Sequence, residues 1–190
     1  MYKPYYSYFH RNLDRFLLRL YLVLTNKSNL LSKKDKLQHD ESIERCFEDL
    51  ITHKEDISKD FSRMRHFDFV CQRYNSCNIS FDKNVLFEYF CKICINSFSI
   101  LDVSLNEIGS SLYIANSYFD HSCVPNATTI FSGTYLEIRA IKEIDVGDKI
   151  YINYVDVKND KVTRQKSLKE QYYFECTCPR CKSDFDKGEI

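Results

Sequence analysis

Glycine is scarce in this chain of 190 residues, which contains only four. They stand at Gly109, Gly133, Gly147 and Gly188, so no two lie close enough for a G-x-G-x-x-G turn or a P-loop. Both motifs need glycine because the backbone must approach a phosphate closely. The sequence therefore argues against a Rossmann dinucleotide site and against P-loop phosphoryl transfer.

The chain also lacks a net charge, because its 27 lysine and arginine residues equal its 27 aspartate and glutamate residues. A protein that binds a nucleic acid needs a surplus of basic groups to neutralise phosphates. An unrelated zinc protein that binds DNA or RNA fits this composition poorly, and no direct nucleic-acid partner is expected.

No hydrophobic run is long enough to cross a membrane. The most apolar N-terminal stretch, Phe16–Leu24, is interrupted by Arg19 and follows Arg11, Asp14 and Arg15. A transmembrane helix needs about 20 consecutive apolar residues. This stretch therefore predicts an amphipathic helix, and no membrane partner is expected.

Nine cysteines are many for this length, yet they do not read as a secreted disulfide framework. Their number is odd, and no signal peptide precedes them. Thiols stay reduced in the cytosol and the nucleus. We therefore expect a reducing compartment, such as the nucleus or the cytoplasm.

The hydrophobic periodicity predicts an α+β fold, with helices in the first half and a small β structure in the second. Helices are expected at 8–24, twice between Ser32 and Asn75, at Val85–Ile95 behind an Asp82 cap, and at 160–173. Strands are expected at Ala127–Ser132 and Thr134–Ile141, which form a hairpin around Gly133, and at Lys149–Tyr154.

Cys176, Cys178 and Cys181 form a C-x-C-x-x-C motif near the end of the chain. Zinc binds four nitrogen or sulfur ligands in a tetrahedron, so three thiolates this close together suit one zinc ion and leave one ligand to be found. Cys123 and His121, in a short polar run before the expected hairpin, are the candidates. The alternative is three thiols without a metal beside a frayed terminus.

Three ordered motifs in the second half resemble one known family. They are His121-Ser122-Cys123-x-Pro125-Asn126, then Ile144-x-x-Gly147-Asp148-x-Ile150-x-x-x-Tyr154, then the terminal C-x-C-x-x-C. Together they are similar to the C-terminal half of a SET domain with its post-SET zinc site. Two further segments resemble one branch of that family, the SET and MYND (SMYD) proteins. These segments are Asn96-Ser97-Phe98-Ser99-Ile100 and Gln171-Tyr172-Tyr173-Phe174-Glu175-Cys176. Members of this branch are protein-lysine methyltransferases that use S-adenosylmethionine.

The resemblance implies three parts and two sets of binding residues. Residues 1–95 would be the helical insertion of the branch, 96–156 the C-terminal SET core, and 157–190 the post-SET segment. Cys123 would join Cys176, Cys178 and Cys181 as the fourth zinc ligand. Phe174 would pack on the adenine of S-adenosylmethionine, which the His121 loop would cradle. The cofactor-binding residues carried over are Asn96, Asp120, His121, Tyr154 and Phe174.

The same resemblance assigns Phe98, Tyr154 and Tyr172 to the channel that receives the substrate lysine. An ammonium group has no lone pair, so a narrow aromatic passage that disfavours the charged amine helps to expose the nucleophile. Aromatic faces also attract cationic groups. The Tyr154 hydroxyl would act as the catalytic group that orients the amine or the methyl group. The expected partner is a protein that carries a lysine, either a histone or a nonhistone protein.

Departures from the family pattern keep a second hypothesis open. Asp120 stands where the family has asparagine, which replaces an amide donor with a carboxylate near the cofactor pocket. The sequence holds no Gly-x-Gly turn and no MYND zinc finger, so we expect a cut through a larger protein or a gene model that lost its first exons. The alternative is a noncatalytic, zinc-stabilised protein-interaction module, a degenerate SET relative.

Overall fold

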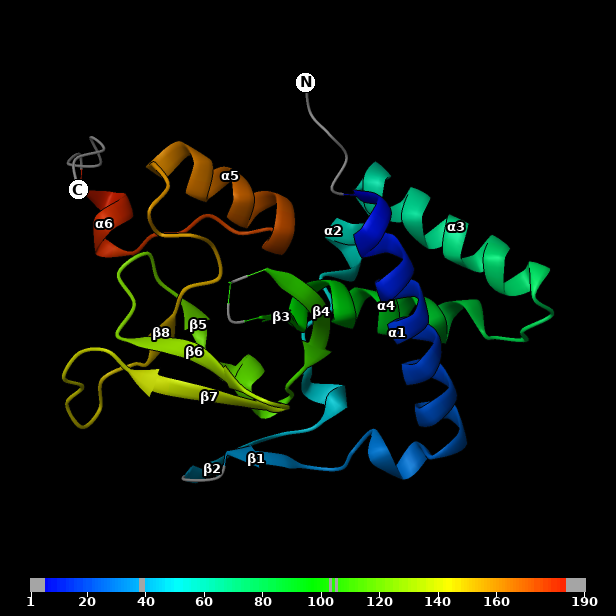
Figure 1. The fold of residues 1–190 in the computed structure, drawn as a ribbon, viewed down its shortest axis with the longest axis horizontal. Helices are drawn as coiled ribbons and strands as arrows, with labels where there is room; N and C mark the ends of the chain where they lie inside the picture. Colours follow the sequence, from blue (N-terminus) through cyan, green and yellow to red (C-terminus); the bar gives the residue numbers. More distant parts are fainter. Residues whose placement is uncertain (1–5, 38–39, 103, 105, 184–190) are drawn as a thin grey trace. The chain divides into compact units, whose positions relative to one another are not determined.

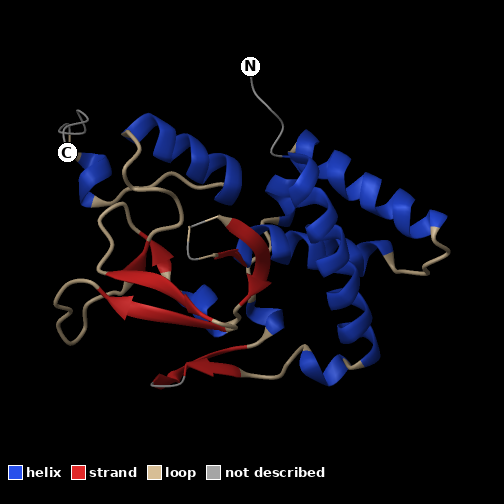
Figure 2. Cartoon of the chain, in the orientation of Figure 1, coloured by secondary structure: helices blue, strands red, loops and turns tan. Residues whose placement is uncertain are grey.

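The computed structural model describes residues 6–37, 40–102, 104 and 106–183, and its mixture of helices and short strands confirms the α+β class. The chain separates into two compact units, Met1–Ala115 and Asn116–Ile190. Figures 1 and 2 show that most of the helical content belongs to the first unit, while both units contain two-stranded ladders. The domain boundaries expected at residues 95 and 156 stay predictions.

The first unit is built around helix α4 (Lys83–Asn96), whose near-continuous apolar sequence predicted a buried helix. Asp82 caps it by accepting hydrogen bonds from the backbone N–H groups of Asn84 and Val85, as predicted. Three helices contact α4, namely α1 (Tyr6–Asn26), the short α2 (Lys54–Lys59) and α3 (Phe61–Ser76). The most deeply buried apolar side chains of these helices are Leu17, Ile57, Phe67, Val70, Leu86, Phe90 and Ile93.

A buried carboxylate links α1 to α3. Asp14 is 3% exposed, and its two oxygens lie 2.8 Å from His66 Nε2 and 2.6 Å from Arg73 Nη1. The Tyr74 hydroxyl donates to the Asp14 carbonyl oxygen at 2.6 Å. A carboxylate removed from water is tolerated only with such partners, so this network specifies which face of α1 meets α3.

The prediction of two helices between Ser32 and Asn75 is wrong for its first part. Residues there form β1 (Asp35–Leu37) and β2 (Asp40–Arg45), an antiparallel pair, and the helices begin only at α2. Lys34 and Lys36 lie 3.6 and 3.9 Å from the Glu44 carboxylate, across the hairpin. These charge pairs favour the hairpin, but they leave no periodic apolar signal in the sequence.

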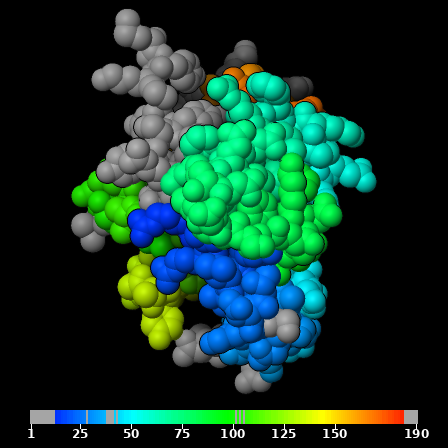
Figure 3. Space-filling view, turned by 90° about the vertical axis from the view of Figure 1, so that its right-hand side faces the viewer, coloured from blue at the N-terminus to red at the C-terminus, as the bar shows by residue number. Residues whose placement is uncertain are grey.

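A second ladder follows α4 directly, where no strands were expected. It consists of β3 (Ser97–Leu101) and β4 (Glu107–Leu112), which pair in antiparallel register. Helix α3 faces the viewer in Figure 3. Its Phe61 and Phe69 side chains are 80% and 51% exposed. Within the described ranges, no helix combines the length and the apolar character that a membrane span requires.

The second unit contains the predicted hairpin and the predicted terminal helix. Strands β6 (Ala127–Ser132) and β7 (Tyr135–Ala140) turn at Gly133, whose φ of 61° suits a residue without a Cβ atom. Helix α5 (Lys161–Tyr172) begins at Asp160, which accepts a hydrogen bond from the Thr163 backbone. A short helix, α6 (Pro179–Lys182), ends the described chain.

The strand expected at Lys149–Tyr154 is shorter than predicted. Only Tyr151–Ile152 forms a strand, β8, and it pairs in parallel with β5 (Asp120–His121). The Asn126 side chain takes the place of a further strand partner, because its amide donates to Lys149 O at 3.0 Å and accepts from Tyr151 N at 2.8 Å. This nonlocal pairing draws Tyr154 toward the His121 loop.

Candidate functional site

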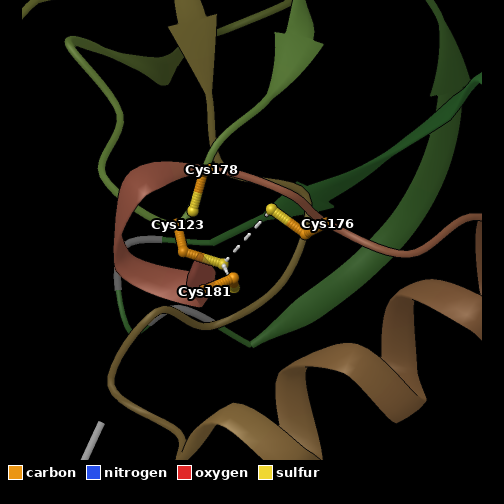
Figure 4. Close-up of side chains that lie close together, drawn as sticks. All are labelled: Cys123, Cys176, Cys178 and Cys181. Atoms are coloured by element: carbon orange, nitrogen blue, oxygen red, sulfur yellow. Dashed lines mark hydrogen bonds between the residues drawn. The ribbon is translucent and has the colours of Figure 1, made fainter. Parts of the chain in front are cut away.

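The four cysteines of the sequence motifs lie together in the second unit (Figure 4). All four Sγ atoms are within 4.8 Å of one another, and Cys123 Sγ lies 3.6 Å from Cys181 Sγ and 3.9 Å from Cys176 Sγ. A tetrahedron with zinc–sulfur distances of about 2.3 Å has sulfur–sulfur edges of about 3.8 Å. The cluster therefore has the dimensions of a tetrathiolate site that can hold a zinc ion.

The local structure around each cysteine explains this convergence. Cys123 follows β5, while Cys178 is the N-cap of α6 and Pro179 provides its first helical residue. Cys176 is fixed from α5, because the Gln165 amide donates to its carbonyl oxygen at 2.7 Å and accepts its backbone N–H at 2.8 Å. The described chain thus closes a loop between positions 123 and 176.

The thiols differ in how easily they ionise. Burial opposes ionisation of Cys178, but backbone N–H groups of Cys181 and Cys123 outweigh it and lower its pKa to about 6. Burial raises the pKa of Cys123 and of Cys176. The backbone N–H groups around Cys178 therefore favour its thiolate form, which is the form that binds a metal.

His121 is held beside the cluster as a neutral ring. Its Nδ1 accepts the backbone N–H of Tyr154 at 3.0 Å, so the neutral ring carries its proton on Nε2, which lies 3.3 Å from Cys123 Sγ. Burial, and then the charge of Arg164, lowers the pKa of His121 to about 4. The arrangement makes His121 a donor to Cys123 and a link to Tyr154.

An aromatic cluster packs directly against the cysteine cluster. It consists of His121, Tyr154, Tyr172 and Phe174, and the last three are partly buried against Cys123, Cys176 and Cys181. The Tyr154 ring centroid is 5.5 Å from that of His121, 4.9 Å from that of Tyr172 and 6.5 Å from that of Phe174. Four of the residues assigned by the resemblance are therefore brought together in one place.

Tyr154 is oriented from both ends. Its backbone N–H is bound by His121, and its hydroxyl donates to the Phe119 carbonyl oxygen at 2.6 Å. Because β8 ends two residues earlier, the ring leaves the strand toward α5 and the residues that follow it. A hydroxyl fixed in this way is suited to position a second polar group by accepting from it.

Asp120 has a partner that the sequence did not suggest. Its carboxylate lies 2.5 Å from Lys149 Nζ, and the pair is exposed. The hydrogen bond to Asp120 and its charge raise the pKa of Lys149 above its usual value. The carboxylate that replaces the family's asparagine is thus neutralised by a neighbouring cation.

Asn96 and Phe98 belong to the first unit. The Asn96 amide donates to Ile51 O and to Lys92 O, both at 2.8 Å. Asn96 is the last residue of α4, and its side chain connects the end of this helix to the backbone at residue 51. The Phe98 ring lies 6.0 Å from that of Tyr113. Their assignments to the cofactor site and to the lysine channel stay predictions.

The sequence patterns did not single out Arg164, although its side chain contacts two of the four cysteines. Its side chain is fully buried, and Nε lies 3.2 Å from Cys123 Sγ. An arginine in a strongly polar helix is expected on the exposed face. The only local signal is its spacing of four residues from Leu168, which is also fully buried.

The α+β fold and the four-cysteine cluster agree with a SET domain followed by a post-SET segment. The family model for the SET domain matches residues 25–155, which is more than half of the chain. The chain belongs to this family.

The relatives specify the branch. Over 104 residues, 55% of this chain and 24% of the relative, the chain is 42% identical to histone-lysine N-methyltransferase SMYD3 of Mus musculus. It is 29% identical to N-lysine methyltransferase SMYD2 of Homo sapiens over 168 residues, which is 87% of this chain and 36% of that protein. These similarities confirm the SMYD resemblance. The chain spans between about a quarter and about a third of the length of these relatives.

Proposed function

We propose that the protein is an S-adenosylmethionine-dependent protein-lysine N-methyltransferase, of which this chain supplies the C-terminal SET and post-SET parts. The observation that carries the proposal is the packing of Tyr154, Tyr172 and Phe174 against the four-cysteine cluster. It supports a site in which a metal closes the tail of the chain onto the His121 loop. Both relatives are named as lysine methyltransferases.

The resident metal of the proposal is zinc, held by Cys123, Cys176, Cys178 and Cys181. Soft thiolate ligands in a compact tetrahedral set favour zinc over magnesium or calcium, which prefer oxygen. The sulfur–sulfur distances near 3.8 Å support this assignment. Its role is structural, because four protein ligands leave no open coordination position.

S-adenosylmethionine would supply a methyl group that its sulfonium already activates. The residues of this chain then need to bind the cofactor, to orient the lysine amine and to exclude water from both. Phe174 remains partly exposed, so it offers an aromatic face for the adenine. Tyr154 and Tyr172 form an aromatic wall that disfavours a charged ammonium, and the Tyr154 hydroxyl positions the neutral amine for an in-line approach.

The proposed substrate is a lysine side chain of a protein, and the name of the SMYD3 relative makes a histone the first candidate to test. Four reduced thiols are needed for the metal, which supports residence in the nucleus or the cytoplasm. The second candidate function is a noncatalytic, zinc-stabilised interaction module. The Asp120–Lys149 pair favours it, because an occupied ion pair stands where the family has an amide.

Titration calorimetry with S-adenosylmethionine tests the proposal on the metal-loaded chain. We expect saturable binding of one molecule, and we expect Phe174→Ala to weaken it about fivefold or more, because stacking of a base on an aromatic ring contributes about 1–3 kcal/mol. Phe61→Ala, which removes an exposed ring on α3, is the matched control and should bind normally. Absence of heat with folded, metal-loaded protein would favour the noncatalytic module instead.

A further inference from the structure

Arg164 is a fully buried arginine that the proposed chemistry does not use. It extends from α5 into the cysteine cluster, where Nε lies 3.2 Å from Cys123 Sγ and Nη2 lies 3.8 Å from Cys181 Sγ. Nη1 donates to the Asn159 carbonyl oxygen at 2.5 Å. One guanidinium thus spans two of the four sulfurs and is anchored to the chain just before its own helix.

The burial of this group indicates what it contacts in the functional state. A guanidinium remains charged in proteins, and taking it out of water is costly unless it meets an anion or several acceptors. A neutral thiol is a weak acceptor, whereas a thiolate is a good one. The geometry around Arg164 is therefore matched to ionised cysteines, which is the form that a metal requires.

The charge of a metal-loaded cluster also favours a cation at the position of Arg164. Four thiolates carry four negative charges and Zn²⁺ carries two positive ones, so a buried tetrathiolate centre has a net charge of minus two. One guanidinium at hydrogen-bond distance reduces this to minus one. The effect falls mainly on Cys123, whose sulfur also faces His121 Nε2 at 3.3 Å.

We propose that Arg164 is a positioning residue of the metal centre, which binds the metal-bound thiolates of Cys123 and Cys181 and stabilises the loaded site against loss of its metal. This inference rests on the zinc site of the proposed function. Residues that hydrogen-bond to metal ligands typically contribute a factor of about 10 to 100 to metal affinity. Cys123 is the ligand most distant in sequence, so Arg164 protects the contact that joins the two ends of the second unit.

The test compares Arg164→Met and Arg164→Lys with Lys166→Met in the full chain. Lys166 lies on the same helix with its side chain 69% exposed, so its replacement removes one positive charge without touching the cluster. Zinc affinity is measured by competition with a chromophoric chelator. We expect R164M to bind zinc about 10- to 100-fold more weakly, R164K to show a smaller loss, and K166M to match the unsubstituted chain.

A second readout separates hydrogen bonding from packing. In the Co²⁺-loaded protein, N–H groups on a thiolate stabilise its lone pairs and raise the energy of the sulfur-to-metal charge-transfer band. We expect this band to move to lower energy in R164M and partly back in R164K. If R164M fails to fold, R164K carries the test, because one ammonium cannot reproduce the three contacts and the band should still shift.

The outcomes are distinguishable. Equal zinc affinity in R164M, or a weaker affinity with an unmoved band, overturns the role of Arg164 and leaves the zinc site in place. An unsubstituted chain that binds neither Zn²⁺ nor Co²⁺ overturns the zinc site of the proposed function and the role of Arg164 together.

Discussion

Replacing Cys176 with serine is expected to unfold most of the second unit while the helices of the first unit persist. The buried core around the cluster is small and consists of Leu168 with Cys123, Cys176 and Cys181, so the metal replaces much of the hydrophobic stabilisation that a larger core would give. Structural zinc contributes about 10–16 kcal/mol to the folding of zinc-finger peptides. Loss of one of four thiolates removes a large share of such a contribution.

Hydrogen exchange measures this effect at each backbone amide. In C176S, the amides of α5 and of the β6–β7 hairpin should lose their protection, whereas those of α3 and α4 should keep it. Cys77→Ser is the matched control, because Cys77 is exposed at the end of α3 and outside the cluster. A metal chelator added to the unsubstituted chain should reproduce the pattern. Unchanged protection of α5 in C176S would contradict a metal-dependent fold.

Replacing Tyr154 with phenylalanine is expected to abolish methyl transfer while the fold stays intact. The substitution keeps the ring that packs between His121 and Tyr172, and it removes only the hydroxyl that donates to the Phe119 carbonyl oxygen. Loss of one partly buried hydrogen bond costs about 1 kcal/mol of stability. Loss of the group that orients the reacting amine costs about 100-fold or more in kcat.

The measurement is the initial rate of methyl transfer to a histone mixture, together with calorimetry of S-adenosylmethionine. We expect kcat to fall while cofactor affinity stays close to normal, because the aromatic surface is unchanged. Tyr135→Phe controls for the chemical change itself, since Tyr135 is 74% exposed on β7. A Y154F variant with near-normal kcat would leave Tyr154 with a purely structural role.

Elements that depend on neighbours in the sequence were predictable. The strand-forming residues on both sides of Gly133 predict the hairpin, and the apolar run behind Asp82 predicts the buried helix α4. In both cases the composition of the segment and its turn or cap residue lie within a few positions of each other. Local chemistry alone therefore specifies the structure.

Elements that depend on distant partners were not predictable in the same way. The β1–β2 hairpin is held by cross-strand charges and by the Asp35 carboxylate, which accepts the Ala115 N–H at 3.0 Å. Strand β8 has two residues because the Asn126 side chain replaces its next partner. Such contacts join positions far apart in the chain, and no periodic pattern marks them.

The residues of the candidate site also fall into those that the sequence predicted and those that it did not. The cysteine motif and the resemblance pointed to the four sulfurs and to Tyr154, Tyr172 and Phe174, which the structure brings together. Arg164 and Gln165 were missed, because an arginine and a glutamine in a polar helix look like exposed residues. Their importance appears only when the helix lies against the cysteine cluster.

X-ray absorption at the zinc edge tests the central claim most directly, because it counts the atoms bound to the metal and measures their distances. We expect the purified chain to hold one zinc ion with four sulfur neighbours at about 2.3 Å and no nitrogen neighbour. Cys123→Ser should lose most of the bound zinc, and the fraction that remains should have three sulfur neighbours. A centre with three sulfurs and one nitrogen, or a folded chain without zinc, would contradict the account.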